Sequence, residues 1–126
     1  MKFRLFDTSV NNLSLKKSVV SEDSFDLQFS NGYTEENDKA FVVSFELSLK
    51  SEHGYELTVT YVGQFETDEP ISDGFKNSQF PIVNAPAITY PYLRSFVSLI
   101  TLNSGFEPLI LPTINFQALA DQQKSK

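Results

Sequence analysis

The sequence contains no cysteine and only one histidine, His53. Without cysteine the chain cannot form a disulfide, a thiolate nucleophile or a sulfur-based metal site. His53 follows Glu52 and precedes Gly54 in a predicted turn, with no recognisable nucleophile or metal partner nearby. The chain also lacks a G-x-S-x-G elbow, an EF-hand loop and a glycine-rich phosphate loop. We therefore expect no catalytic residue, no metal ligand and no cofactor, and predict that the protein is not an enzyme.

Long apolar runs and an excess of positive charge are also missing. The longest apolar stretch, residues 96–102, is interrupted by two hydroxyl side chains and is too short to span a bilayer. The first ten residues contain Arg4 and Asp7 where a signal peptide needs an apolar core. A net charge of −6 opposes binding to a phosphate backbone. We expect a soluble, cytoplasmic protein without a nucleic-acid partner or a membrane insertion.

Aromatic side chains, in contrast, are plentiful. The 126 residues include 12 Phe and 5 Tyr, and 40% of all residues are hydrophobic. This length predicts one domain, residues 1–126, with a single core. Rings at the ends of predicted elements, such as Phe75 and Phe80, are candidates for partial exposure. An exposed apolar groove would indicate a binding site rather than a contribution to stability.

Alternation of apolar and polar residues predicts four strands. It is clear in residues 41–49 and, after a turn at residues 51–54, in residues 55–65, which together predict a long hairpin. Residues 25–29 alternate as well, and the Asn31-Gly32 pair predicts a turn at their end. Residues 34–39 are polar and are expected to form a loop.

The first strand is less regular. In residues 3–15 the apolar positions change parity, which a bulge or bend between Asp7 and Asn12 would reconcile. The sheet is therefore expected to be four-stranded and antiparallel, with one apolar face.

Helices are expected after the strands. Residues 70–80 are rich in turn residues and predict a loop or crossover, whereas Pro91 suits the first turn of a helix that ends at Gly105. This helix has two apolar stripes, so it needs a second partner besides the sheet, and we expect that partner to be another subunit. Prolines keep residues 106–114 extended, and Asn115 suits the N-cap of a short helix from residue 116 to about 123. The predicted class is α+β.

Residues near the C-terminus carry a family resemblance. Residues 90–94 (Tyr-Pro-Tyr-Leu-Arg), the Gly105-Phe106 turn and residues 111–116 (Leu-Pro-Thr-Ile-Asn-Phe) follow the predicted sheet in this order. This arrangement resembles the SecB family of protein-export chaperones, whose helix start, G-x-F turn and L-x-P-[VI]-N-F segment follow a four-stranded sheet. Motif identity covers about residues 90–119, while the order of elements matches most of the chain.

The resemblance implies an ATP-independent holdase that binds unfolded or precursor proteins. SecB proteins are homotetramers built as dimers of dimers, with long helices between the sheets, so a homodimer or homotetramer is expected. The residues expected at the peptide-binding groove are Phe65, Phe80, Tyr90, Tyr92, Phe106, Leu109, Leu111 and Phe116. The residues expected at the oligomer interface are Leu93, Phe96, Leu99, Ile100 and Leu102.

The chain departs from the family pattern in two places, and the first affects the expected partners. Export SecB proteins pass clients to the SecA motor through outward carboxylates, which fall here on Asn12, Lys16 and Thr58. Losing carboxylates weakens association with a basic partner, so binding to SecA is doubtful. The proline of the L-x-P segment also stands one place early, as Pro112, with Thr113 in its usual position.

Three alternatives to a general export chaperone remain open. Some SecB-like chaperones protect one partner antitoxin, and the missing carboxylates favour such a dedicated role. A second alternative is a module that holds a small apolar ligand in the same groove, which saturable one-to-one binding would reveal. The third is an enzyme that depends on His53.

Overall fold

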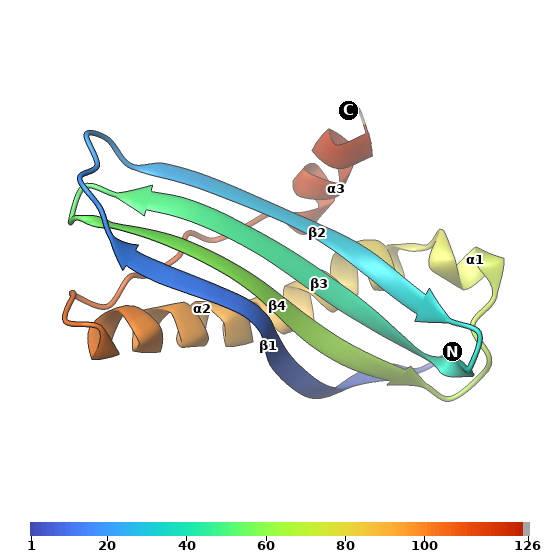
Figure 1. Ribbon diagram of the computed structural model, residues 1–126. Coiled ribbons are helices and arrows are strands. Elements are labelled where there is room, and N and C mark those ends of the chain that lie inside the picture. Colours follow the sequence, from blue (N-terminus) through green and yellow to red (C-terminus); the bar gives the residue numbers. More distant parts are fainter. Residues whose placement is uncertain (125–126) are drawn as a thin grey trace.

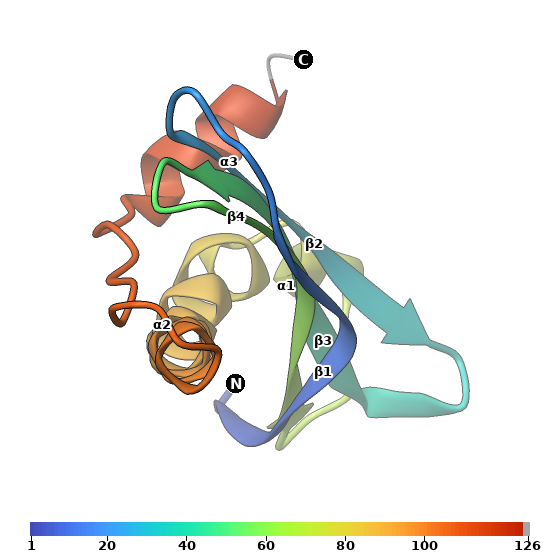
Figure 2. The ribbon, with the colours of Figure 1, turned by 60° about the vertical axis from the view of Figure 1, so that its left-hand side comes forward.

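The computed structural model describes residues 1–124, as a four-stranded antiparallel sheet followed by helices. The strands are β1 (Phe3–Lys17), β2 (Ser24–Thr34), β3 (Asn37–Ser51) and β4 (Tyr55–Thr67). The helices are α1 (Asp73–Lys76), the π-helical turn η1 (Phe80–Asn84), α2 (Ala85–Asn103) and α3 (Phe116–Lys124). The strand order is β1-β4-β3-β2, and α2 runs along one face of the twisted sheet (Figures 1 and 2). The α+β class and the four-stranded sheet are confirmed.

The predicted alternation of β3 and β4 produces the core. Residues of one parity are buried beneath the helices, while most of those between them are half-buried or exposed. Phe41 pairs with Phe65 across the two strands, Phe45 with Tyr61 and Leu49 with Leu57, so large apolar side chains face each other along the inner surface. α2 packs on this surface through Leu93 and Val97, which are fully buried.

Strand β1 contains two irregularities rather than one. Its pairing with β4 shifts register between Leu5 and Asp7 and again between Val10 and Asn12. Each shift leaves one extra residue on β1, which bends an edge strand and restores the inward parity of its apolar side chains. The predicted bulge is thus confirmed, with a second one just before the predicted region.

The turn predicted at Asn31-Gly32 is wrong. β2 continues to Thr34, and Gly32 pairs with Val42 inside the β2–β3 ladder. A Cβ on Gly32 would lie 2.7 Å from Val42 Cγ2, so glycine here permits a close approach rather than a turn. Continuing the strand also places Tyr33 inward, where its ring stacks on Phe41 at 6.0 Å. The predicted polar loop therefore shrinks to the turn between Thr34 and Asn37.

Helix α2 begins at Ala85, six residues before the predicted start, and Pro91 lies inside it. The proline in the first turn is Pro86. Pro91 cannot donate to the carbonyl of Ala87, but both residues are exposed, so solvent can satisfy that oxygen. The expected loop at residues 70–80 contains α1 and the start of η1 and no strand.

The end of α2 follows the prediction. Gly105 has φ +93°, and the N–H groups of Gly105 and Phe106 donate to the carbonyls of Leu102 and Thr101. This is the Schellman pattern that ends a helix at a glycine. Residues 106–114, called the connecting segment below, contain no helix or strand, and the Asn115 side chain accepts from the N–H of Ala118 at 3.0 Å as an N-cap of α3.

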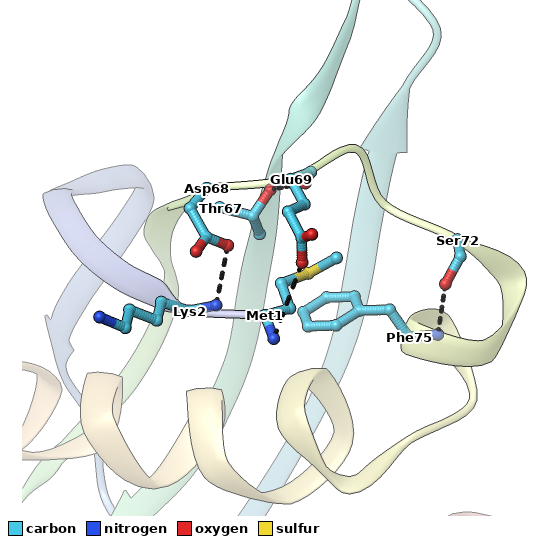
Figure 3. Close-up of polar contacts among 7 residues, drawn as sticks. All are labelled: Met1, Lys2, Thr67, Asp68, Glu69, Ser72 and Phe75. Carbon is cyan, nitrogen blue, oxygen red and sulfur yellow. Dashed lines mark hydrogen bonds and ion pairs between the residues drawn. The ribbon is translucent and has the colours of Figure 1, made fainter.

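The crossover from β4 to α2 is fastened to the start of the chain. The N–H of Lys2 donates to Asp68 Oδ1 at 2.8 Å, and the N–H of Asp68 donates back to the Lys2 carbonyl at 3.0 Å. Ser72 caps α1 by accepting from the N–H of Phe75 (Figure 3). Phe75 belongs to an aromatic cluster at this end of the sheet, made of Phe3, Tyr33, Phe41, Phe65, Phe75 and Phe80.

Candidate peptide-binding groove

The connecting segment is held against α2 by three hydrogen bonds. The Tyr90 hydroxyl donates to the Pro112 carbonyl at 2.6 Å, and Ser98 Oγ donates to the Leu109 carbonyl at 2.7 Å. The N–H of Leu109 donates to Thr101 Oγ1 at 2.9 Å. Because prolines keep this segment out of a regular β-ladder, side chains of α2 form hydrogen bonds with its main-chain groups instead.

Tyr90 is the most perturbed titratable group at this site. Burial raises the pKa of its phenol to about 12, although the nearby Arg94 guanidinium acts in the opposite direction. The ring contacts Phe116 at 5.4 Å and Phe45 at 6.0 Å. Tyr90 therefore remains a neutral hydrogen-bond donor at physiological pH and ties the connecting segment to the core.

Two apolar hollows flank the connecting segment, and Ile110 and Leu111 border both. One hollow of about 560 Å³ lies between this segment and the exposed face of α2. The other, called the sheet groove below, has a volume of about 370 Å³ and lies between the segment and the sheet end formed by β2 and β3. Its lining consists of Asp23, Ser24, Phe25, Leu49, Lys50, Ser51, His53, Leu109, Ile110, Leu111 and Pro112.

The sheet groove combines aliphatic and aromatic walls with charged residues at its rim. Ile110 is 68% exposed and Phe25 is 41% exposed, so two large apolar side chains of this groove face water. Asp23 Oδ1 accepts from the N–H of Glu52 at 2.6 Å and so joins the start of β2 to the β3–β4 turn. A groove lined by both apolar and polar residues suits a stretch of extended polypeptide, which offers apolar side chains and a polar backbone.

The residues predicted for peptide binding do not form one surface. Phe65, Tyr90, Leu111 and Phe116 are buried in the core. Phe106 and Leu109 are half-buried, with the Phe106 ring 4.4 Å from Tyr55. Phe80 and Tyr92 are exposed, but Phe80 belongs to the aromatic cluster while Tyr92 lies on α2. Leu109 and Leu111 are the two that border the sheet groove.

Sequence reasoning missed Phe25, Leu49 and Ile110 as groove residues. Phe25 and Leu49 pair across β2 and β3, where their parity predicts burial beneath the helices. At this end of the sheet the extended connecting segment replaces a helix, so the cover is incomplete. The prolines of the connecting segment were the signal in the sequence that could have indicated this groove, because a segment without regular structure leaves part of a sheet uncovered.

The residues predicted for the oligomer interface occupy two sides of α2. Leu93 is fully buried against the sheet, and the half-buried Phe96 contacts Tyr61 at 5.9 Å. Leu99 and Leu102 are 57% and 52% exposed, and Ile100 is intermediate. The outward apolar side of this helix exposes apolar surface to water, and this contact is unfavourable.

The outer face of the sheet is polar. Lys16 lies 3.9 Å from Glu56, and Thr58 borders a shallow depression together with Asn12, Asp26 and Glu46. Carboxylates thus lie near these three positions, with Glu56 on β4, Asp26 on β2 and Glu46 on β3. Among residues 1–124 no helix has the length and hydropathy required to cross a membrane, and no group of three His, Cys, Asp or Glu side chains is placed to hold a metal.

Comparison with protein families identifies the chain's relatives. A family model described as preprotein translocase subunit SecB matches residues 4–126. A SecB protein-export protein from Magnetococcus marinus is 31% identical over 119 residues, covering 86% of this chain and 73% of the relative. One from Ehrlichia canis is 28% identical and covers 91% of this chain and 69% of the relative.

Comparison with solved structures agrees on the fold. The Rv1957 SecB-like chaperone of Mycobacterium tuberculosis, solved with a ChAD peptide from the Rv1956 HigA1 antitoxin, superposes with a TM-score of 0.68. Its sequence identity is 16%, and the match covers 89% of this chain and 87% of that chain. A Streptococcus agalactiae protein of unknown function gives a TM-score of 0.61 at 12% identity.

Proposed function

This chain belongs to the SecB family of protein-export chaperones, and from that premise we propose that it is an ATP-independent holdase of the cytoplasm. It binds unfolded or precursor polypeptides and prevents their aggregation. The observation that carries this proposal is the sheet groove, where exposed Phe25 and Ile110 flank an open apolar channel. Apolar contacts without a fixed hydrogen-bonding pattern suit many client sequences.

Oligomerisation is part of the proposal. The outward side of α2 carries exposed Tyr92, Leu99 and Leu102, beside a hollow of about 560 Å³. A homodimer or homotetramer would bury this surface and place several sheet grooves on one particle. Several weak contacts to one unfolded chain then give high avidity without sequence specificity.

Transfer of clients to SecA is expected to be weak. Three positions correspond to the SecA-binding carboxylates of export SecB proteins. Here Lys16 is basic and is ion-paired with Glu56, while Asn12 and Thr58 are neutral. A charge-complementary surface that has lost its carboxylates steers a basic partner less well. Lys16→Glu with Thr58→Glu should therefore increase SecA binding, measured by calorimetry at low and high salt.

A dedicated role is the second candidate function. The missing carboxylates at Asn12, Lys16 and Thr58 favour it, and a SecB-like chaperone of similar fold has been solved with an antitoxin peptide. A dedicated chaperone would bind one partner tightly and would not protect unrelated unfolded proteins. A small apolar ligand held one-to-one in the sheet groove would be a third outcome.

The test is suppression of aggregation without ATP. The purified protein is mixed with a chemically unfolded polypeptide, and light scattering is followed during dilution, with the native form of the same polypeptide as control. We expect suppression and selective binding of the unfolded form. Binding of neither form would contradict the general holdase and leave a dedicated partner or a small ligand as the alternatives.

A further inference from the structure

The side chain of Gln123 imitates a neighbouring strand at the edge of the sheet. β2 is an edge strand, and the N–H of Phe29 donates to Gln123 Oε1 at 3.1 Å. Gln123 Nε2 donates back to the Phe29 carbonyl at 3.2 Å. A primary amide offers the same donor and acceptor as a peptide group, so this reciprocal pair matches one rung of an antiparallel ladder.

The rest of this edge can be deduced from Phe29. Alternate residues of an antiparallel strand direct both main-chain groups to the same side, so Leu27 and Phe25 also point theirs away from β3. Among residues 1–124 no hydrogen bond joins the main chain of Phe25 or Leu27 to a group outside the sheet. This open stretch begins in the sheet groove, whose lining includes Phe25.

We propose that an extended client segment pairs with β2 as a fifth strand beside Phe25 and Leu27, and that Gln123 is a displaceable latch that closes the edge at Phe29. This inference rests on the proposed function. A short segment occupies the open stretch and leaves the latch in place. A longer segment must take over the two hydrogen bonds at Phe29 and release Gln123 from the edge.

The contacts of α3 indicate that such a release is local. The helix is anchored at its start by Phe116, whose ring packs on Phe29 at 6.2 Å and on Tyr90 at 5.4 Å. Gln123 stands one residue before the end of the helix, where turns open at little cost. The last turn can therefore leave the edge while Phe116 remains in the core.

The geometry favours a client segment over a second copy of β2. A second copy would bring its own connecting segment and α3 against the same edge, where those of the first copy already lie. A single extended chain needs only the strip between the connecting segment and the edge. Its alternate side chains would enter the sheet groove, and its backbone would supply the hydrogen bonds.

The test compares Gln123→Ala with a matched change on the same helix, Gln117→Ala, whose side chain bonds Gln79 and Asp121 rather than β2. Affinities are measured for a short peptide of about five residues and a long one of about ten, both with alternating apolar residues. Losing the latch should strengthen binding of the long peptide by about tenfold and leave the short one unchanged. Gln117→Ala should change neither affinity.

Gln123→Glu provides a second variant of similar shape. It keeps the acceptor for the Phe29 N–H but cannot donate to the Phe29 carbonyl, so it loses one of the two hydrogen bonds and should strengthen binding of the long peptide by less than Gln123→Ala does. Hydrogen exchange provides a readout without any client. The Phe29 amide should exchange faster in Gln123→Ala than in the parent chain, and adding the long peptide should protect it again.

The outcomes separate the latch from the holdase. Equal affinities of parent and Gln123→Ala for both peptides overturn the latch while the holdase stands. Binding of neither peptide by either protein overturns both. Self-association of Gln123→Ala without peptide, to a larger oligomer than the parent chain forms at the same concentration, would show that the edge takes a second copy, which also overturns the proposal.

Discussion

The two ends of the sheet use apolar residues in opposite ways. At the crossover end the rings of the aromatic cluster pack on one another, with Phe41 and Phe65 stacked at 5.0 Å and both buried. At the groove end the sheet surface around Phe25 and Leu49 meets the connecting segment and remains partly open. The crossover end has the richer supply of rings, yet the groove end has the more accessible apolar channel.

The number of aromatic rings at one end of the sheet therefore does not determine whether that end has an accessible apolar groove. Rings that converge from β1, β2, β3, β4 and α1 fill the space between these elements and stabilise the fold. The groove depends instead on a segment that cannot form regular structure. What leaves the apolar surface open is the poor cover of the connecting segment, rather than the number of rings nearby.

The largest expected effect tests the crossover end of the sheet. Phe65→Ala removes a ring that is fully buried and stacked on Phe41, and should lower the free energy of unfolding by about 3–5 kcal/mol. Phe25→Ala at the open end should cost about 1 kcal/mol or less, since its ring is already partly in water. Urea unfolding at equal protein concentration measures both. Similar losses at the two positions would contradict the comparison.

The next effect concerns client binding at the groove end of the sheet. Ile110→Ser removes the most exposed large hydrophobic side chain of the sheet groove and should weaken binding of an unfolded client by about tenfold. Its stability should change by no more than about 0.5 kcal/mol. Val19→Ser is the control, because this side chain is fully exposed and does not line the groove. Equal weakening by both changes would show that exposed apolar area, rather than the groove, determines binding.

A smaller effect tests the tie between Tyr90 and the connecting segment. Tyr90→Phe removes the hydrogen bond to the Pro112 carbonyl and should cost about 1 kcal/mol at neutral pH. Because the pKa of Tyr90 is raised from 10.0 to about 12 in the folded protein, its contribution is complete below pH 10 and is lost as the pH rises toward 12.

The parent and Tyr90→Phe proteins should therefore converge in stability through this alkaline range. Urea unfolding at a series of pH values measures the convergence, and the other tyrosines are common to both proteins. A constant difference between the two proteins would show that Tyr90 ionises equally in the folded and unfolded states.

The smallest effect tests the fastening of the crossover. Asp68→Ala removes the side-chain bond to the Lys2 N–H, which is exposed, so the cost should be about 0.5 kcal/mol. Client binding should be unchanged, because the sheet groove is lined by the start of β2 and the end of β3, and these strand ends lie at the opposite end of the sheet from the crossover (Figure 1). Thermal unfolding and the same client assay measure both, and a large loss of client binding would place part of the client site at the crossover.

Local patterns predicted the elements whose cause is local. Period-two alternation predicted β3 and β4, and Gly105 and Asn115 predicted the end of α2 and the start of α3. One error arose where a contact from elsewhere in the chain overrode a local preference, and another where an earlier proline occupied the first turn of the same helix. Gly32 resembles a turn residue until Tyr33 is seen stacked on Phe41, and Pro91 resembles a helix start until Pro86 is seen in the first turn.

The sequence by itself determined the class of the fold, the apolar face of the sheet and the family resemblance, because periodicity, caps and motif spacing act over a few residues. Only the tertiary structure decided which apolar residues face water. Exposure depends on which segments lie over a given side chain, and those segments come from distant parts of the chain. Phe65 and Phe25 have the same side chain and both alternate with polar neighbours, yet α1 and β1 bring rings to the region of Phe65, while an extended segment leaves Phe25 open.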